Sequence, residues 1–115
     1  MQPIIHKMKL KPKPFEMIKS GRKTIELRLL DEKRRLVKVG DIIEFVNTDD
    51  GEILTKRVKA LHCFDSFEAL YSSLPLLKCG YTEPDVKTAK YTDMEEYYSK
   101  EEQKLFGVVG IELWD

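Results

Sequence analysis

The chain has 115 residues, of which 42% are apolar and 35% are charged, and its formal net charge is zero. A chain of this length forms one domain around one core, so we expect residues 1–115 to be a single domain. It contains neither the ~18 consecutive apolar residues of a membrane span nor the apolar run of a signal peptide, which predicts a cytoplasmic protein without membrane contact. Its two cysteines, Cys63 and Cys79, are too few for a disulfide scaffold or a complete zinc site, and we expect two buried thiols.

The first half of the chain predicts two strands with a short helix between them. Residues 4–10 alternate between apolar and polar positions, as a half-buried strand does. Pro14 suits the first position of a helix over 14–20, and Gly21 suits the left-handed position that ends it. Residues 24–30 alternate again and predict the second strand.

The second half adds three strands and two helices. The predicted elements are a strand over 41–47, a hairpin turn at 49–51, a strand over 52–62, a helix capped by Asp65 or Ser66, interrupted by Pro75 and ended by Gly80, a helix over 93–100, and a strand over 106–114. Thr92 and Glu95 have the spacing of a capping box for the second helix. The order β-α-β-β-β-α-α-β predicts an α+β domain with a small, strongly curved sheet, closed or nearly closed into a barrel.

Charge is distributed unevenly along the chain. Residues 7–38 carry twelve Lys/Arg and four Asp/Glu, whereas residues 39–115 carry eight and sixteen. Such asymmetry indicates contact with nucleic acid, although the two halves could equally pair their charges across the folded surface.

The densest group of polar residues lies where the first helix ends and the second strand begins. Glu26 and Arg28 share one face of the predicted strand, and Lys23 precedes it with a side chain long enough to reach the same space. Two cations beside a carboxylate favour its ionised form, which accepts hydrogen bonds from an amino group. The guanidinium offers a planar fork to phosphate, carboxylate or a base edge. The same spacing also fits a solvated surface ion pair.

These residues belong to an ordered pattern that resembles the ASCH domain. The pattern comprises Phe15 and Ile18, then Gly21-x-Lys23-x-x-Glu26-x-Arg28, Gly40-Asp41-x-Ile43, and Gly107-Val108-Val109-Gly110-Ile111, and it spans about residues 5–113. The resemblance implies a PUA-like fold, in which a small β-barrel with flanking helices borders a cleft. It further implies work on RNA or nucleotides, with Lys23, Glu26 and Arg28 lining that cleft.

The resemblance also implies an enzymatic alternative. One branch of the family removes the acyl group from N4-acetylcytidine, and ribonuclease activity is described elsewhere in it. The hydrolase branch uses a lysine, a threonine three residues later and a glutamate in the helix before the last strand. Lys23 matches the lysine, but Glu26 occupies the threonine position, and the late glutamate falls at Glu95 or Glu96. A carboxylate at that position could serve as a general base on water.

Other side chains have both a structural and a functional interpretation. His6 and His62 are each in phase with apolar strand residues, so we expect partly buried, hydrogen-bonded histidines and no metal site. Glu95 could close the capping box instead of reaching a cleft. The basic residues Lys33, Arg34 and Arg35 could bind phosphate or form a solvated loop.

Aromatic residues could stack on bases or fill the core. They are Phe64, Tyr91, Tyr97, Tyr98 and Trp114. Tyr97 and Tyr98 are neighbours on the predicted helix and point about 100° apart, so at most one should be buried in the core. We assign Tyr98 to the predicted ligand site.

Three hypotheses follow. The first is a cofactor-free, monomeric module that binds RNA or a nucleotide-like ligand through Lys23, Glu26 and Arg28, helped by Tyr98 and the basic loop. The second is a hydrolase of an N-acylated nucleoside or of RNA, with Lys23, Glu26 and either Glu95 or Glu96 as its catalytic set. The third is a module whose polar groove binds a peptide.

Overall fold

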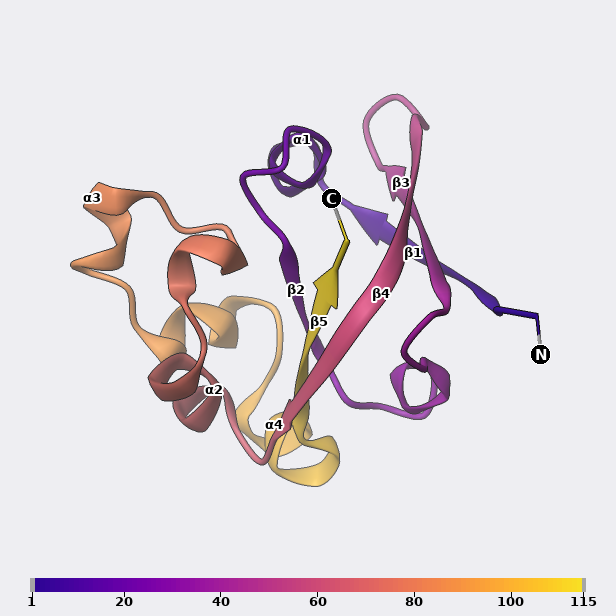
Figure 1. Ribbon diagram of the computed structural model, residues 1–115. Coiled ribbons are helices and arrows are strands. Elements are labelled where there is room, and N and C mark those ends of the chain that lie inside the picture. Colours follow the sequence, from indigo (N-terminus) through magenta and orange to yellow (C-terminus); the bar gives the residue numbers. More distant parts are fainter. Residues whose placement is uncertain (1, 115) are drawn as a thin grey trace.

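The protein is an α+β domain in which a five-stranded sheet curls into a half-barrel beside a layer of helices. A computed structural model of the protein describes residues 2–114. Its elements are β1 (Ile5–Leu10), α1 (Pro12–Lys19), β2 (Ile25–Leu29), the 3-10 helix η1 (Arg34–Leu36), β3 (Ile42–Asn47), β4 (Ile53–Phe64), α2 (Phe67–Ser73), η2 (Leu76–Cys79), α3 (Glu83–Val86), η3 (Tyr91–Glu96), α4 (Lys100–Phe106) and β5 (Val108–Leu113). This confirms the predicted fold class. Figure 1 shows α2, α3 and α4 gathered on the side of β2 and β5, away from β1 and β3.

The sheet has the strand order β1-β3-β4-β5-β2. β1 pairs with β3 in parallel, and the other neighbours are antiparallel. Curling brings the two edge strands towards each other, and Arg28 of β2 bridges them by donating from Nη2 to the backbone carbonyl of Lys9 in β1 at 2.8 Å. Free strand edges are templates for unwanted pairing, and this closure protects part of both edges.

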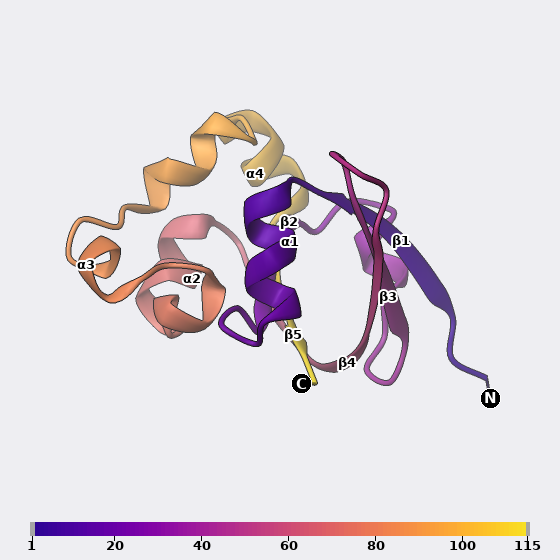
Figure 2. The ribbon, with the colours of Figure 1, turned by 90° about the horizontal axis from the view of Figure 1, so that it is seen from above.

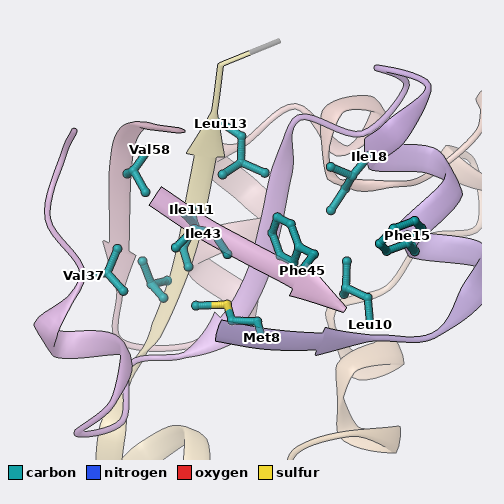
Figure 3. Close-up of a cluster of buried hydrophobic side chains, with 11 residues drawn as sticks. Met8, Leu10, Phe15, Ile18, Val37, Ile43, Phe45, Val58, Ile111 and Leu113 are labelled. Carbon is teal, nitrogen blue, oxygen red and sulfur yellow. The ribbon is translucent and has the colours of Figure 1, made fainter. Parts of the chain in front are cut away.

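The main core fills the inside of the curl (Figure 3). Met8 and Leu10 of β1 and Ile43 and Phe45 of β3 point inward on alternate positions, as the alternation predicts. Helix α1 covers one end of the curl with Phe15, which is fully buried. In the view from above, α1 lies between β1 and β3 on one side and α2 and α3 on the other (Figure 2).

A second cluster joins β2 to the helical layer. It comprises Ile25, Leu27, Leu29, Phe67, Leu70, Cys79 and Val108. The apolar face of β2 therefore packs against the helical layer, while Glu26 and Arg28 project from the opposite face.

In the first half of the chain, the predicted boundaries are off by at most one residue except at the start of α1, where two prolines lie in the first turn. Helix α1 begins at Pro12, so the prediction that Pro14 starts it was wrong by two residues. Proline is tolerated throughout the first turn, where backbone N–H groups have no intrahelical partner. Gly21 and Gly51 have φ of 81° and 77°, as the helix end and the hairpin require.

The second helical region differs most from prediction. Ser66 caps α2 by accepting from the backbone N–H of Ala69 at 3.2 Å, which decides between the two predicted caps. The Thr92–Glu95 capping box was wrong, because that segment is the 3-10 helix η3. The capping box instead joins Ser99 to Glu102 and begins α4, an additional helix. η3 begins one residue before Thr92, with Lys90 at its N-cap, so Thr92 lies inside the first turn and is not a cap. The backbone N–H of Lys90 donates to Asp93 Oδ2 at 3.1 Å instead.

Both histidines are partly buried and hydrogen-bonded, as predicted. His6 Nε2 lies 2.8 Å from Asp41 Oδ2, and His62 Nε2 lies 2.8 Å from Glu112 Oε1. Cys79 is buried, but Cys63 is exposed, so the prediction of two buried thiols was wrong for Cys63. Among residues 2–114, no helix has both the length and the apolar character needed to cross a bilayer.

Candidate functional site

The side chains of Lys23, Glu26 and Arg28 converge on one point between the sheet and the helices. Lys23 lies in the connection between α1 and β2, where its backbone N–H donates to the Met17 carbonyl at 3.0 Å. Glu26 and Arg28 follow on β2 at alternate positions, so both project from the same face. The helix end and the strand together fix the backbone on each side of the group.

Glu26 accepts from both cations. Its Oε1 lies 2.7 Å from Lys23 Nζ, and its Oε2 lies 2.9 Å from Arg28 Nε. The three side chains are only 10%, 5% and 12% exposed in the order Lys23, Glu26 and Arg28. A fully solvated surface pair is therefore excluded, and a charge-assisted, largely buried triad takes its place.

The triad keeps Glu26 ionised. Burial alone would raise the pKa of Glu26, but the positive charges of Lys23 and Arg28, and the hydrogen bonds they donate, hold that pKa below its ordinary value. A carboxylate offers about four lone-pair directions. Lys23 and Arg28 use two of them, so Glu26 retains capacity for a ligand donor.

The backbone of Gly80 lies directly against the Lys23 side chain. It follows η2 with φ of 107°, a left-handed conformation that favours glycine. A Cβ built there would lie 3.2 Å from Lys23 Cδ and 3.7 Å from its Nζ. Glycine at this position thus allows the η2 turn to approach Lys23 closely and orient its ammonium towards Glu26.

The triad forms part of the wall of a cavity of about 390 Å³. That volume lies within the range of small-molecule sites. The cavity is lined by Lys9, Lys11, Lys13, Lys23 and Arg28, by Glu26, by Tyr71, Tyr81, Tyr97 and Tyr98, and by Leu10, Pro14, Met17, Leu27, Cys79, Gly80 and Met94. Five basic side chains against one carboxylate give the lining a formal charge of +4, which favours an anionic ligand.

Four tyrosines form the aromatic part of the wall. Tyr98 is half-buried and stacks on Phe67, with ring centroids 6.0 Å apart and planes 18° apart. Tyr97 is exposed and lies beneath Lys11, whose Nζ is 5.9 Å from the ring centroid. This pair joins the start of α1 to the end of η3 across the cavity. Tyr91 and Trp114 are exposed, so neither fills the core.

Cys79 is a buried residue of the cavity lining and carries a neutral thiol. Burial raises the pKa of Cys79 to about 11, although the nearby Lys23 charge opposes the shift. Because the thiolate is the nucleophilic form, Cys79 contributes packing rather than covalent chemistry.

The structure does not bring the other predicted residues into this cavity. Arg34 pairs with Asp31 at 3.0 Å, and Arg35 donates to the carbonyls of Leu30 and Phe106. Lys33 is exposed in the same connection. These residues are separate from the cavity lining.

The two late glutamates also lie outside the lining. Glu95 Oε1 is 3.7 Å from Lys100 Nζ, and Glu96 is exposed. A catalytic role for Glu95 remains a prediction that would need this segment to move. Within residues 2–114, no group of three or more His, Cys, Asp or Glu side chains is placed to hold a metal ion.

Sequence reasoning missed several residues of the site. Tyr71, Tyr81 and Gly80 come from α2 and the turn after η2, about fifty residues from the triad. No local pattern marks them, because only the tertiary packing of η2 on β2 brings them there. Lys9, Lys11 and Lys13 were visible as basic residues, but their convergence on the cavity follows from the path of the chain from β1 into α1.

Comparisons with known proteins agree with this architecture. The family model for the ASCH domain matches residues 8–114. The crystal structure of hypothetical protein PH0355 is 35% identical over 96% of this chain and 97% of that chain, with a TM-score of 0.77. The solution structure of protein PF0455 from Pyrococcus furiosus is 34% identical over 96% of each chain, with a TM-score of 0.69.

A more distant structure supports the fold alone. ASCH from Zymomonas mobilis is 19% identical over 96% of this chain and 67% of that chain, with a TM-score of 0.67. A comparison with curated proteins found no match. Because the family model covers nearly the whole chain and two structures exceed 30% identity along it, the protein belongs to the ASCH domain family, as a PUA-like domain of the general RNA-binding type.

Proposed function

We propose that the cavity binds a nucleotide, either free or as one residue of an RNA strand, and that Glu26 is the group that recognises its base. The observation that carries this proposal is a buried, ionised carboxylate in the wall of a cavity whose lining is otherwise strongly positive. A ligand suited to it presents both a hydrogen-bond donor and negative charge. A nucleotide with an exocyclic amino group has both.

Each part of the wall has a matching part of the ligand. The amino group of the base donates to Glu26, while the tyrosines offer rings on which a base can stack. Phosphate lies nearest the basic side chains of Lys9, Lys11 and Lys13, which are exposed at the junction of β1 and α1. The Lys23 ammonium has three hydrogen-bond donors. Within residues 2–114 one of them is used on Glu26, and the others can bind a ligand oxygen.

In this proposal Arg28 mainly positions Glu26. Its Nε bonds the carboxylate and its Nη2 bonds the Lys9 carbonyl, so two of its donors are already engaged within the protein. The guanidinium thereby holds Glu26 in place and ties the cavity wall to β1.

Calorimetric titration tests the proposal. Wild-type protein is titrated with cytidine 5′-monophosphate, adenosine 5′-monophosphate and a short single-stranded RNA. Glu26→Gln keeps the shape of the side chain but removes its charge, and we expect at least a tenfold loss of affinity. Glu112→Gln is the matched control, because Glu112 also accepts from basic side chains but lies on β5 outside the lining.

The outcomes are distinct. Binding by wild type and the control, with weaker binding by Glu26→Gln measured where circular dichroism shows it folded, supports the proposal. Equal binding by all three proteins, or no binding of any ligand by wild type, refutes it.

Hydrolysis is the second candidate for the same cavity. The observation in its favour is the ammonium of Lys23, held 2.7 Å from the Glu26 carboxylate in the wall of the cavity. Incubation with N4-acetylcytidine followed by chromatography tests it. Release of cytidine by wild type but not by Lys23→Met would make the protein a hydrolase rather than a binding module, whereas intact substrate would exclude that reaction.

A further inference from the structure

Two tyrosines of the cavity wall and an aspartate form a hydrogen-bonded group, in the order Tyr71, Tyr81 and Asp93. Tyr71 comes from α2, Tyr81 from the turn after η2, and Asp93 from η3. The two phenol oxygens lie 2.6 Å apart, and the Tyr81 oxygen lies 2.9 Å from Asp93 Oδ2. The rings meet edge to face, with centroids 5.8 Å apart. Both tyrosines line the cavity.

The order of the protons in this hydrogen-bonded group follows from what each side chain can do. An ionised carboxylate can only accept, and Asp93 Oδ2 already accepts from the backbone N–H of Lys90 at 3.1 Å. The Tyr81 hydroxyl must therefore donate its single proton to Asp93. With that proton committed, the bond between the two phenols is donated by Tyr71.

Both hydroxyls keep their protons over the physiological pH range. Burial raises the pKa of Tyr81, and its hydrogen bonds to Tyr71 and Asp93 raise it further. Burial also raises the pKa of Tyr71, although the bond to Tyr81 opposes the shift. Tyr71 therefore donates to Tyr81, and Tyr81 donates to Asp93. The Tyr71 oxygen then has only lone pairs to offer a ligand.

We propose that Asp93 is a positioning residue which, through Tyr81, fixes Tyr71 as a hydrogen-bond acceptor, so that the cavity selects bases with an exocyclic amino group over bases with a carbonyl there. This inference rests on the proposed function, because it names the class of nucleotide that the same cavity takes. Glu26 is also an acceptor, so two separate parts of the wall favour a donor on the ligand. Cytosine and adenine present such a donor, whereas uracil presents a carbonyl oxygen at the corresponding position.

The ratio of two dissociation constants tests the inference. Cytidine and uridine 5′-monophosphate share their sugar and phosphate, and their bases have nearly the same shape. We expect wild type to prefer the cytidine nucleotide by about tenfold or more. Tyr81→Phe deletes one oxygen and frees the Tyr71 proton to turn into the cavity, so this preference should fall roughly tenfold. Asp93→Ala should act in the same direction, and Asp93→Glu should restore part of the preference.

Two further variants separate this effect from a general loss of structure. Tyr71→Phe removes the acceptor itself, so it should weaken binding of the cytidine nucleotide while leaving the uridine nucleotide nearly unchanged. Tyr91→Phe is the control, because Tyr91 is an exposed tyrosine of η3 that lies outside both the cavity lining and the hydrogen-bonded group, and it should keep the wild-type ratio. A purely structural role would weaken both ligands together and leave the ratio constant.

Failure of the inference can be told apart from failure of the proposed function. If wild type binds both nucleotides equally, or Tyr81→Phe leaves the ratio unchanged, the selectivity claim is overturned while nucleotide binding stands. If wild type binds neither nucleotide, both the proposed nucleotide binding and its selectivity are overturned.

A Raman measurement tests the order of the protons without any ligand. The Raman doublet of tyrosine, taken as the difference between the spectra of wild type and Tyr71→Phe, reports whether the Tyr71 phenol donates or accepts a hydrogen bond. A donating phenol supports the proton order, and an accepting one refutes it without any ligand.

Discussion

Replacing Glu26 by glutamine should destabilise the protein even though the two side chains have the same shape. The change leaves the ammonium of Lys23 and the guanidinium of Arg28 without a counter-charge at positions 10% and 12% exposed. Removing one partner of a buried ion pair costs about 3–5 kcal/mol. Because a cavity adjoins the triad and water can reach it, we expect the lower end, about 3 kcal/mol, or roughly 10 °C in Tm.

Urea denaturation of wild type, Glu26→Gln and Lys19→Met measures this effect. Lys19 and Glu52 form an exposed pair at 2.6 Å, so Lys19→Met breaks an ion pair of similar length without leaving a buried charge. We expect the control to unfold at nearly the wild-type urea concentration. A Glu26→Gln protein within about 0.5 kcal/mol of wild type would refute the buried, charge-balanced triad.

The pH dependence provides an independent check. The pKa of Glu26 in the folded protein lies below its ordinary value of about 4.5. The contribution of ionised Glu26 to the free energy of unfolding is therefore complete above pH 4.5, and it is lost as the pH falls through the folded-state pKa. The stability difference between wild type and Glu26→Gln should therefore be constant near neutrality and shrink below about pH 4.5. A difference that grows on acidification would mean that the pKa of Glu26 is raised, contrary to the structure.

Three other perturbations follow from the same geometry. Gly80→Ala and Gly51→Ala should each lose about 1–2 kcal/mol of stability through backbone strain. Only the Cβ added at Gly80 lies against Lys23, so only Gly80→Ala should weaken nucleotide binding in a titration. Equal binding by the two variants would show that the close approach of Gly80 to Lys23 does not matter for the ligand. Arg28→Lys should cost roughly 2 kcal/mol and speed hydrogen exchange in β1, because the bond to the Lys9 carbonyl is lost; wild-type protection there would show that this bridge is unimportant. Affinity for a short RNA should fall about tenfold between about 50 and 200 mM salt, and a flat salt titration would exclude the basic lining as a phosphate site.

The fold was predictable wherever the structure is specified by a regular spacing of apolar residues or by a backbone conformation that only certain residues adopt. Alternation located the strands, and Gly21 and Gly51 marked turns that need positive φ. The prediction failed in the helical region, where Thr92–Glu95 and Ser99–Glu102 both have capping-box spacing. Sequence alone could not choose between them, because the choice depends on which segment can pack against α2 and β2.

The site was predictable in part for the same reason. Lys23, Glu26 and Arg28 lie within six residues, so a strand and its preceding turn suffice to bring them together. The tyrosines that complete the wall come from elements far along the chain and have no shared pattern. The depth of burial of Glu26 was also unforeseen, since alternation places this residue on the polar face of β2 and the side chains that surround it come from segments distant in the sequence.

An NMR titration of isotope-labelled protein with cytidine 5′-monophosphate tests the central claim most directly. Amide signals of Lys23, Gly80 and Tyr81 should shift together and saturate, while those of the β3–β4 hairpin and of Lys33 and Arg35 stay in place. Shifts confined to the basic loop, or none anywhere at millimolar ligand, would contradict a nucleotide site built around Glu26.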